Sequence, residues 1–269
     1  MIGQEKLKKS FSAFTLQTLP KAILLVGRSG CGKHLFASEL AVRFKLGIVK
    51  VELTDDIDSK IAEYQSCPVD TLYEIDLSKI DLKSQNKFLK FIEEPAKNVF
   101  IVIFAEDTNM VLETVQNRCL TYRFEKYSMQ ELKDITKTGY EDYIYEICKT
   151  PGEVNKVNPD TIDKCKILCD TIVRRIHEAS YANTISILNK LNFLDQYDKI
   201  DPILFYGLLK KISCEAYLSQ TDKDKKIETA YAWTIYQTLL KFSELNTNGL
   251  LNKQWYIMAL LSRLWENTR

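Results

Sequence analysis

The sequence predicts a parallel α/β domain followed by helices alone. Short β-rich runs alternate with helical stretches between Lys21 and Phe124, and strand-like runs disappear after Phe124. Strands separated by helices form a mostly parallel sheet with helices on both faces. The chain has only 9 glycines and 6 prolines in 269 residues, which favours long helices towards the C-terminus.

Five segments of the first domain carry this pattern in order. Ala22 to Gly27 is an apolar strand that runs into a glycine loop, and His34 to Phe44 repeats apolar residues at helical spacing. Thr71 to Asp76 is a second strand and Val99 to Glu106 a β-branched third strand. Between them, Ser84 to Pro95 is a helix that its proline ends.

The helical remainder divides at two polar segments. Thr150 to Asp160 holds two prolines and a glycine, and Ser219 to Lys226 reads as a polar loop. We expect an α/β domain over residues 1–124, a small helical domain over 125–158 and a larger helical domain over 159–269.

Composition excludes several classes of protein. The 37 basic and 36 acidic residues nearly cancel, so bulk charge does not select the partner, and 45% hydrophobic residues exclude a disordered chain. The sequence has no apolar run near the roughly 20 residues of a membrane span. Its seven scattered cysteines, an odd number, fit a reducing compartment. We therefore expect a soluble cytoplasmic protein without a membrane partner.

A phosphate-binding loop follows the first strand and opens the next helix. Its residues are Gly27, Arg28, Ser29, Gly30, Cys31, Gly32, Lys33 and His34. Glycines let backbone N–H groups curl around a phosphate, the helix N-terminus adds partial positive charge, and the lysine reaches the terminal phosphates. Nucleotide binding is therefore expected at Gly27, Gly30, Cys31, Gly32, Lys33 and His34.

Two positions of this site depart from the pattern of an active nucleotidase. His34 stands where a Ser or Thr hydroxyl would ligate Mg²⁺, which prefers oxygen ligands. At the end of the second strand, the expected metal-organising carboxylate falls on Ile75, with Asp76 beside it. We expect Glu74 to face the same side as Asp76. Magnesium is therefore not expected, and Asp76 is interpreted as a strand-end carboxylate.

Four stretches within Ile2 to Arg123 are IGQEKLKKSF, LPKAILLVGRSGCGK, SQNKFLKFIEEPAKNVFIVIFAE and TNMVLETVQNRC. Read together, they resemble the clamp-loader AAA+ proteins of DNA replication, in particular the delta-prime kind of bacterial DNA polymerase III. TPGEV (Thr150 to Val154) and NTNGLLNKQWYIMALLSRL resemble, more weakly, the family's lid and its last collar helices.

The resemblance implies a role in an assembly. Clamp loaders are five-subunit arcs that use ATP to place a ring-shaped sliding clamp on primed DNA. It implies a lid over 125–158, an oligomerisation collar over 159–269, and other clamp-loader subunits in a hetero-pentamer, a sliding clamp and primed DNA as partners. The family's Ser-Arg-Cys motif reads Asn117-Arg118-Cys119, so Arg118 is the expected arginine finger for a neighbour's nucleotide site.

Departures from the family suggest that this chain does not hydrolyse ATP itself. Besides His34 and Ile75, the polar first-sensor residue is missing near Ala105 and Glu106, and TPGEV lacks the lid arginine. The loop could still hold ATP or ADP weakly, or survive only as architecture. The family's four-cysteine zinc module is excluded, because only Cys67 lies in that insert.

Other candidate sites are weaker. Lys79, Lys83 and Lys87 flank the helix after the second strand and are candidate DNA contacts. Cysteines 148, 165 and 169 and His177 are better explained by core packing than by a metal, and tryptophans 233, 255 and 265 by a core or subunit interface.

Two alternative functions stay open. One is an active, gamma-like clamp-loader ATPase in which Asp76 and His34 have new roles. The other is a P-loop interaction protein outside replication.

Overall fold

A computed structural model describes residues 3–52, 57–175, 201–221, 231–245 and 253–268. The chain forms two compact units. Unit 1 comprises Met1–Gly139 with Lys149–Gly152, and unit 2 comprises Tyr140–Cys148 with Glu153–Arg269. The segment 125–158, which the sequence suggests as a separate lid, is divided between the two.

Unit 1 is built on a five-stranded parallel sheet with the strand order β2-β3-β4-β1-β5. Its strands are β1 (Ala22–Val26), β2 (Gly47–Val51), β3 (Thr71–Asp76), β4 (Val99–Ala105) and β5 (Leu120–Arg123). The three predicted strands are confirmed as the buried centre of the sheet. The two edge strands were not predicted, because their mostly exposed residues lack a strong apolar pattern.

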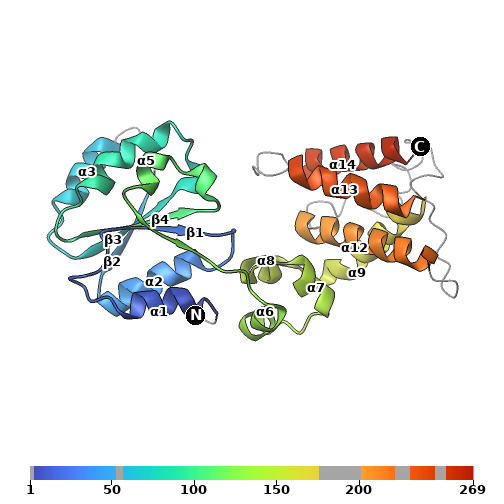
Figure 1. The fold of residues 1–269 in the computed structure, drawn as a ribbon, viewed down its shortest axis with the longest axis horizontal. Coiled ribbons are helices and arrows are strands. Elements are labelled where there is room, and N and C mark those ends of the chain that lie inside the picture. The colour runs from blue at the N-terminus through green and yellow to red at the C-terminus, as the bar shows by residue number, and fades with distance from the viewer. Residues whose placement is uncertain (1–2, 53–56, 176–200, 222–230, 246–252, 269) are drawn as a thin grey trace. The chain divides into compact units, whose positions relative to one another are not determined.

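Helices cover both faces of this sheet, as predicted (Figure 1). On one face lie α1 (Glu5–Ser12) and α2 (Lys33–Phe44), whose Phe11 and Phe36 join a buried cluster with Phe104 of β4. On the other face lie α3 (Ile57–Gln65), α4 (Leu89–Glu93) and α5 (Glu113–Gln116), which pack on a second cluster.

The alternation of β3 between these faces decides which of its side chains can reach α2. Leu72 belongs to the cluster under α2, whereas Tyr73 and Ile75 belong to the opposite cluster. Glu74 and Asp76 therefore share the α2 side, as the period of a strand requires. After β3 come three short 3₁₀ or α turns, η1 (Leu77–Lys79), η2 (Ser84–Phe88) and α4, so the predicted helix of residues 84–95 begins as a 3₁₀ helix.

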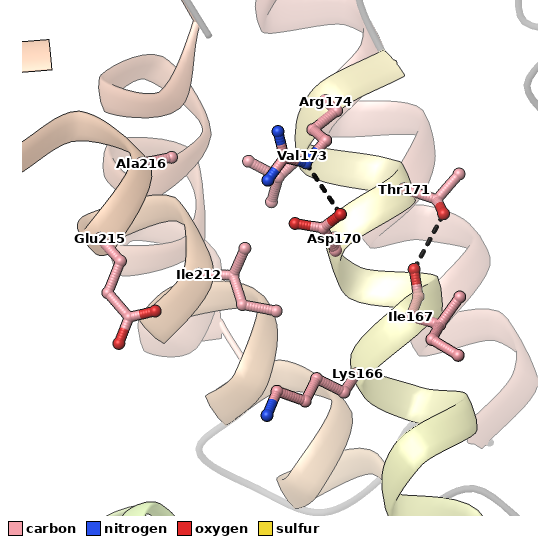
Figure 2. Close-up of a pocket in the computed structure, with 9 residues that line it drawn as sticks. All are labelled: Lys166, Ile167, Asp170, Thr171, Val173, Arg174, Ile212, Glu215 and Ala216. Atoms are coloured by element: carbon pink, nitrogen blue, oxygen red, sulfur yellow. Dashed lines mark hydrogen bonds and ion pairs between the residues drawn. The ribbon is translucent and has the colours of Figure 1, made fainter. Parts of the chain in front are cut away.

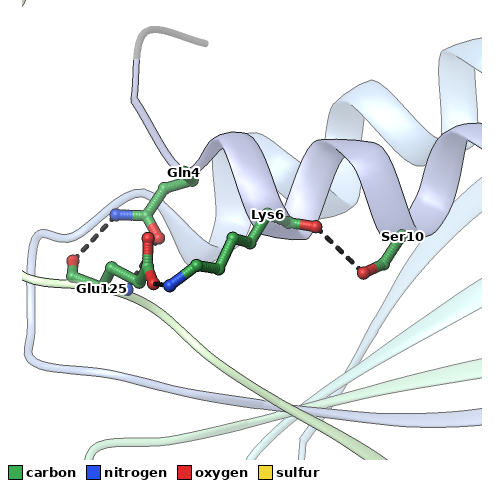
Figure 3. A network of polar contacts seen from close by, with 4 residues as sticks. All are labelled: Gln4, Lys6, Ser10 and Glu125. Atoms are coloured by element: carbon green, nitrogen blue, oxygen red, sulfur yellow. Dashed lines mark hydrogen bonds and ion pairs between the residues drawn. The ribbon is translucent and has the colours of Figure 1, made fainter.

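The N-terminus is fixed to the chain that leaves β5 (Figure 3). Gln4 donates to the Glu125 carbonyl at 2.8 Å and accepts from the Glu125 amide at 2.7 Å, while Lys6 pairs with the Glu125 carboxylate at 2.6 Å. Hydrogen bonding to that carboxylate raises the pKa of Lys6. Beyond this point α6 (Met129–Thr136) begins with a capping box between Ser128 and Glu131.

The secondary-structure elements described in unit 2 are all helices. They are α7 (Asp142–Ile147), α8 (Pro151–Lys156), whose first two residues belong to unit 1, α9 (Pro159–Arg175), α12 (Pro202–Thr221), α13 (Ala232–Leu245) and α14 (Lys253–Asn267). Three of them begin at a proline, because the first turn needs no N–H from that residue. The prolines at 151 and 159 therefore start helices in the predicted linker, and α12 extends into the predicted polar loop. His177 lies outside the described residues.

Cysteines of unit 2 pack in its core, as predicted. Cys148, Cys165 and Cys169 are buried, and the Cys169 thiol donates to the Phe205 carbonyl at 3.5 Å. Burial raises the pKa of Cys169. Trp233 is 43% exposed and lies against Tyr217 and Tyr236, and none of the described helices is long and apolar enough to cross a membrane. Trp265 is half-buried, and the side chain of Trp255 lies outside the description.

Candidate nucleotide-binding site

The loop between β1 and α2 has the backbone geometry that glycine makes possible. Gly30 and Gly32 have φ angles of 75° and 98°, in a region that other residues rarely adopt. Gly32 is the N-cap of α2, so the free N–H groups of the first helical turn lie at the loop. This arrangement can receive a phosphate group.

Lys33 lies across the inner side of this loop. Its side chain is buried, and its ammonium donates to the carbonyls of Gly27 and Arg28, the latter at 3.2 Å. Three donors from more distant parts of the chain also bind carbonyl oxygens of this loop. Tyr127 donates its hydroxyl to the Cys31 carbonyl at 2.7 Å, Thr150 its hydroxyl to the Ser29 carbonyl at 3.0 Å, and Gly152 its amide to the Gly30 carbonyl at 3.0 Å.

These three residues, the capping donors, hold the loop by its carbonyl oxygens. The side chains of Tyr127 and Thr150 were not predicted as site residues, because they lie 96 and 121 positions from their acceptors. The only sequence signal was the resemblance of TPGEV to a lid segment. Burial raises the pKa of Tyr127 to about 12, so its hydroxyl stays a donor at neutral pH.

A cavity of about 280 Å³ opens beside the loop where three strands end. Its lining residues are Ser29, Gly30, Gly32, Lys33, His34, Leu35, Asp76, Ser78 and Glu106. Because the carboxyl ends of parallel strands share one edge of the sheet, the chain segments that follow β1, β3 and β4 meet here.

Asp76, and not Ile75, is the strand-end residue at the cavity. Ile75 is fully buried in the cluster on the other face of the sheet. The prediction that put the strand-end position of the site at Ile75 was therefore wrong by one residue. Asp76 accepts hydrogen bonds from the Ser78 amide at 3.1 Å and the Ser78 hydroxyl at 2.5 Å. Ala105 is also buried, whereas Glu106 lines the cavity from the end of β4.

The side chain of His34 contacts Glu74 and Phe104 and has no oxygen with which to ligate Mg²⁺. Its Nδ1 lies 3.4 Å from the carboxylate of Glu74, a side chain that is only 4% exposed, and its ring packs on Phe104 with centroids 4.1 Å apart. An imidazole is a poor ligand for Mg²⁺, and within the described residues no cluster of His, Cys, Asp or Glu could hold a metal ion. The side chain at position 34 therefore does not fit a magnesium ion.

Arg118 lies at the opposite edge of the sheet. Leu120 of β5 is level with Ile23 and Arg123 with Val26, so the residues before β5 lie at the amino end of β1, away from the phosphate loop. The Arg118 guanidinium donates to the Thr114 carbonyl at 2.8 Å and pairs with Glu93 at 3.3 Å. Next to it, burial raises the pKa of Cys119 to about 12.

Comparison with known families matches the part of the chain that contains Arg118 and does not include the phosphate loop. Residues 72–128 match the family model described as DNA polymerase III, delta subunit. The matched stretch runs from β3 through Arg118 to the N-cap of α6. Over this stretch, which is less than half of the chain, the sequence is similar to that family.

Solved structures are similar to this chain along most of its length. A DNA polymerase III gamma subunit-related protein from Thermotoga maritima is 12% identical, covers 98% of this chain and 99% of its own, and has a TM-score of 0.46. The RuvB Holliday junction branch migration motor of the same organism is 18% identical, with coverages of 99% and 87% and a TM-score of 0.48. No curated protein matches the sequence.

The three lysines that the sequence suggests as DNA contacts follow β3. Lys83 and Lys87 are exposed at η2, and Lys79 ends η1, although its side chain lies outside the description.

A larger cavity, about 420 Å³, lies between α9 and α12 in unit 2 (Figure 2). Asp170 and Arg174 in its wall pair with each other at 2.8 Å, and Lys166 lies over the Tyr143 ring at 5.3 Å. These contacts engage the charged groups that α9 contributes to the cavity wall.

Proposed function

We propose that this protein is a clamp-loader subunit of the delta-prime kind that donates Arg118 to the ATP site of a neighbouring subunit. The observation that carries the proposal is the position of Arg118 at the sheet edge opposite its own phosphate loop. The length of β5 alone places the amino ends of the strands about 10 Å from their carboxyl ends. Arg118 would therefore act in trans, on the site of another subunit. A guanidinium supplied in trans stabilises charge in phosphoryl transfer.

Under this proposal the chain has no ATPase activity of its own. The imidazole at position 34, engaged by Glu74, supports this, and the loop with Lys33 holds ATP or ADP weakly without Mg²⁺ or zinc. Its partners are other clamp-loader subunits, a sliding clamp and primed DNA, and its location is the cytoplasm.

The test mixes the full chain with candidate clamp-loader ATPase subunits and measures DNA-stimulated ATP hydrolysis. Arg118→Ala is expected to lower the rate by about 10³-fold or more if the finger acts as in other trans-acting sites. Arg123→Ala, at the other end of β5, is the matched control and should leave the rate within about twofold. Equal rates with Arg118 and Arg118→Ala would contradict the finger role.

A second candidate is an active, gamma-like ATPase. It is favoured by the carboxylates of Asp76 and Glu106, which line the cavity with Lys33. In that case the purified chain alone hydrolyses ATP, and Lys33→Ala abolishes the activity. Failure to co-purify with any clamp-loader subunit would instead favour a P-loop interaction protein outside replication.

A further inference from the structure

Every carbonyl oxygen in residues 27–31 of the phosphate loop accepts a hydrogen bond. Lys33 binds the first two, and the capping donors bind the last three. In a trans peptide unit, the carbonyl of one residue and the N–H of the next point in opposite directions, and the described chain has no cis peptide bond. A donor that binds a carbonyl of this loop therefore also sets the direction of the following N–H group.

The capping donors set the directions of three N–H groups, those of Gly30, Cys31 and Gly32. The Cys31 amide closes a turn inside the loop by donating to the Arg28 carbonyl at 3.2 Å. Gly30 and Gly32 line the cavity beside the loop, with Lys33 at the start of α2. N–H groups of neighbouring residues that point into a concave space form a site for an anion. The directions of the Gly30 and Gly32 amides, which a phosphate in the cavity would need, thus depend on the capping donors.

The capping donors themselves do not line the cavity. Thr150 is 3% exposed, and its hydroxyl reaches the loop from the carbonyl side. Thr150 and Gly152 belong to the segment Lys149–Gly152, here called the strap, which is part of unit 1 although the chain on both sides of it is part of unit 2. A change in the loop can therefore act on the strap, and a change in the strap can act on the loop.

We propose that Tyr127, Thr150 and Gly152 are positioning residues for nucleotide binding, which raise the affinity of the loop for the phosphates of a nucleoside diphosphate without touching them. The coupling acts in both directions, because two events that stabilise the same loop conformation favour each other by the same factor. Bound phosphate therefore holds the strap on the loop. This inference rests on the proposed weak nucleotide binding and deepens it, and it does not use Arg118.

Thr150 gives the sharpest test, because its hydroxyl can be removed or kept with little change in volume. Thr150→Val is expected to raise the dissociation constant of ADP for the full chain about fivefold, since without one hydrogen bond fewer molecules hold a correctly formed loop. Thr150→Ser keeps the hydroxyl and should bind ADP within about twofold of the unchanged chain. Calorimetry measures the dissociation constants.

Thr161→Val is the matched control. Thr161 is 5% exposed, and its hydroxyl donates to the Asn158 carbonyl at 2.8 Å within unit 2. This variant should lose about as much stability as Thr150→Val, but its ADP affinity should stay within about twofold of the unchanged chain. A loss of affinity in Thr150→Val alone therefore reports on the loop and not on general stability.

The reverse direction of the coupling is measured at the Gly152 amide, which donates to the Gly30 carbonyl. Saturating ADP should slow the hydrogen exchange of this amide about fivefold, because the strap then opens less often. This measurement uses the unchanged chain, so it tests the inference even if Thr150→Val does not fold, which thermal unfolding shows.

Three results would overturn the inference while ADP still binds. They are equal dissociation constants for the unchanged chain and Thr150→Val, an equal loss of affinity in Thr161→Val, and unchanged exchange of the Gly152 amide in saturating ADP. No binding of ADP to the unchanged chain would instead remove the proposed nucleotide binding, and this inference with it. The Arg118 experiment is unaffected by any of these results, so the two proposals fail separately.

Discussion

At the scale of single residues, a close contact between Gly30 and Gly152 fixes the phosphate loop. A Cβ on Gly152 would lie 2.5 Å from the Gly30 Cα and 3.1 Å from its carbonyl oxygen. Both are backbone atoms, which cannot move aside as a flexible side chain can. The amide of Gly152 also donates to the Gly30 carbonyl, so the two chains touch through backbone alone.

Gly152→Ala is therefore expected to lower the free energy of unfolding by about 1–3 kcal/mol and to weaken ADP binding, because the displaced backbone no longer caps the loop. Urea denaturation and calorimetry measure the two effects. Gly47→Ala is the control, since its new Cβ would meet the nearest atom, Thr71 Oγ1, at an ordinary 3.4 Å. Equal stability of the two variants would show that the contact is not tight in solution.

At the scale of elements, the ends of strands assemble the site, and this is where prediction from the sequence partly failed. The phosphate loop was predictable because its glycines and lysine are adjacent in the chain. The sequence could not decide whether Ile75 or Asp76 lies at the cavity, because a shift of one residue along a strand moves a side chain to the other face of the sheet. The capping donors come from distant segments, so no local pattern could identify Tyr127 or Thr150.

Tyr127→Phe tests how much a capping donor contributes. Loss of the Tyr127 hydroxyl should lower the free energy of unfolding at pH 8 by about 1 kcal/mol, the usual net value of a hydrogen bond. Burial raises the pKa of Tyr127 to about 12, above the ordinary value of 10.0. The native state therefore binds this proton more tightly, and the stability it contributes is present below pH 10 and lost as the pH rises towards 12.

Urea unfolding at pH 8 and pH 11 measures both effects, and the difference between wild type and Tyr127→Phe should shrink at the higher pH. Tyr140→Phe is the control, because its hydroxyl donates to the Val157 carbonyl at 3.0 Å in unit 2. That variant should lose similar stability at pH 8 and keep its ADP affinity. A constant difference between wild type and Tyr127→Phe at both pH values would contradict the role of Tyr127 ionisation.

At the scale of the whole molecule, unit 1 carries one functional candidate at each edge of its sheet. The phosphate loop lies at the carboxyl edge and Arg118 at the amino edge. Such a subunit can receive a contact at one edge and donate one at the other, which is the pattern of head-to-tail assembly. Two of the stretches that carry the family resemblance, SQNKFLKFIEEPAKNVFIVIFAE and TNMVLETVQNRC, meet in the fold through the ion pair of Glu93 and Arg118.

This ion pair leads to a prediction for the assembled complex. Glu93 orients the Arg118 guanidinium from one side while the Thr114 carbonyl holds it from the other. Glu93→Ala removes one of these two contacts, so the finger should sample more orientations, and DNA-stimulated hydrolysis by the neighbouring subunit should fall by about two- to tenfold. Glu94→Ala, next in the chain, is the control and should change the rate less than twofold. Because exposed ion pairs contribute little to stability, Glu93→Ala should unfold at nearly the same urea concentration as the unchanged chain. If it lowers stability and leaves hydrolysis unchanged, Glu93 supports the fold and does not position Arg118.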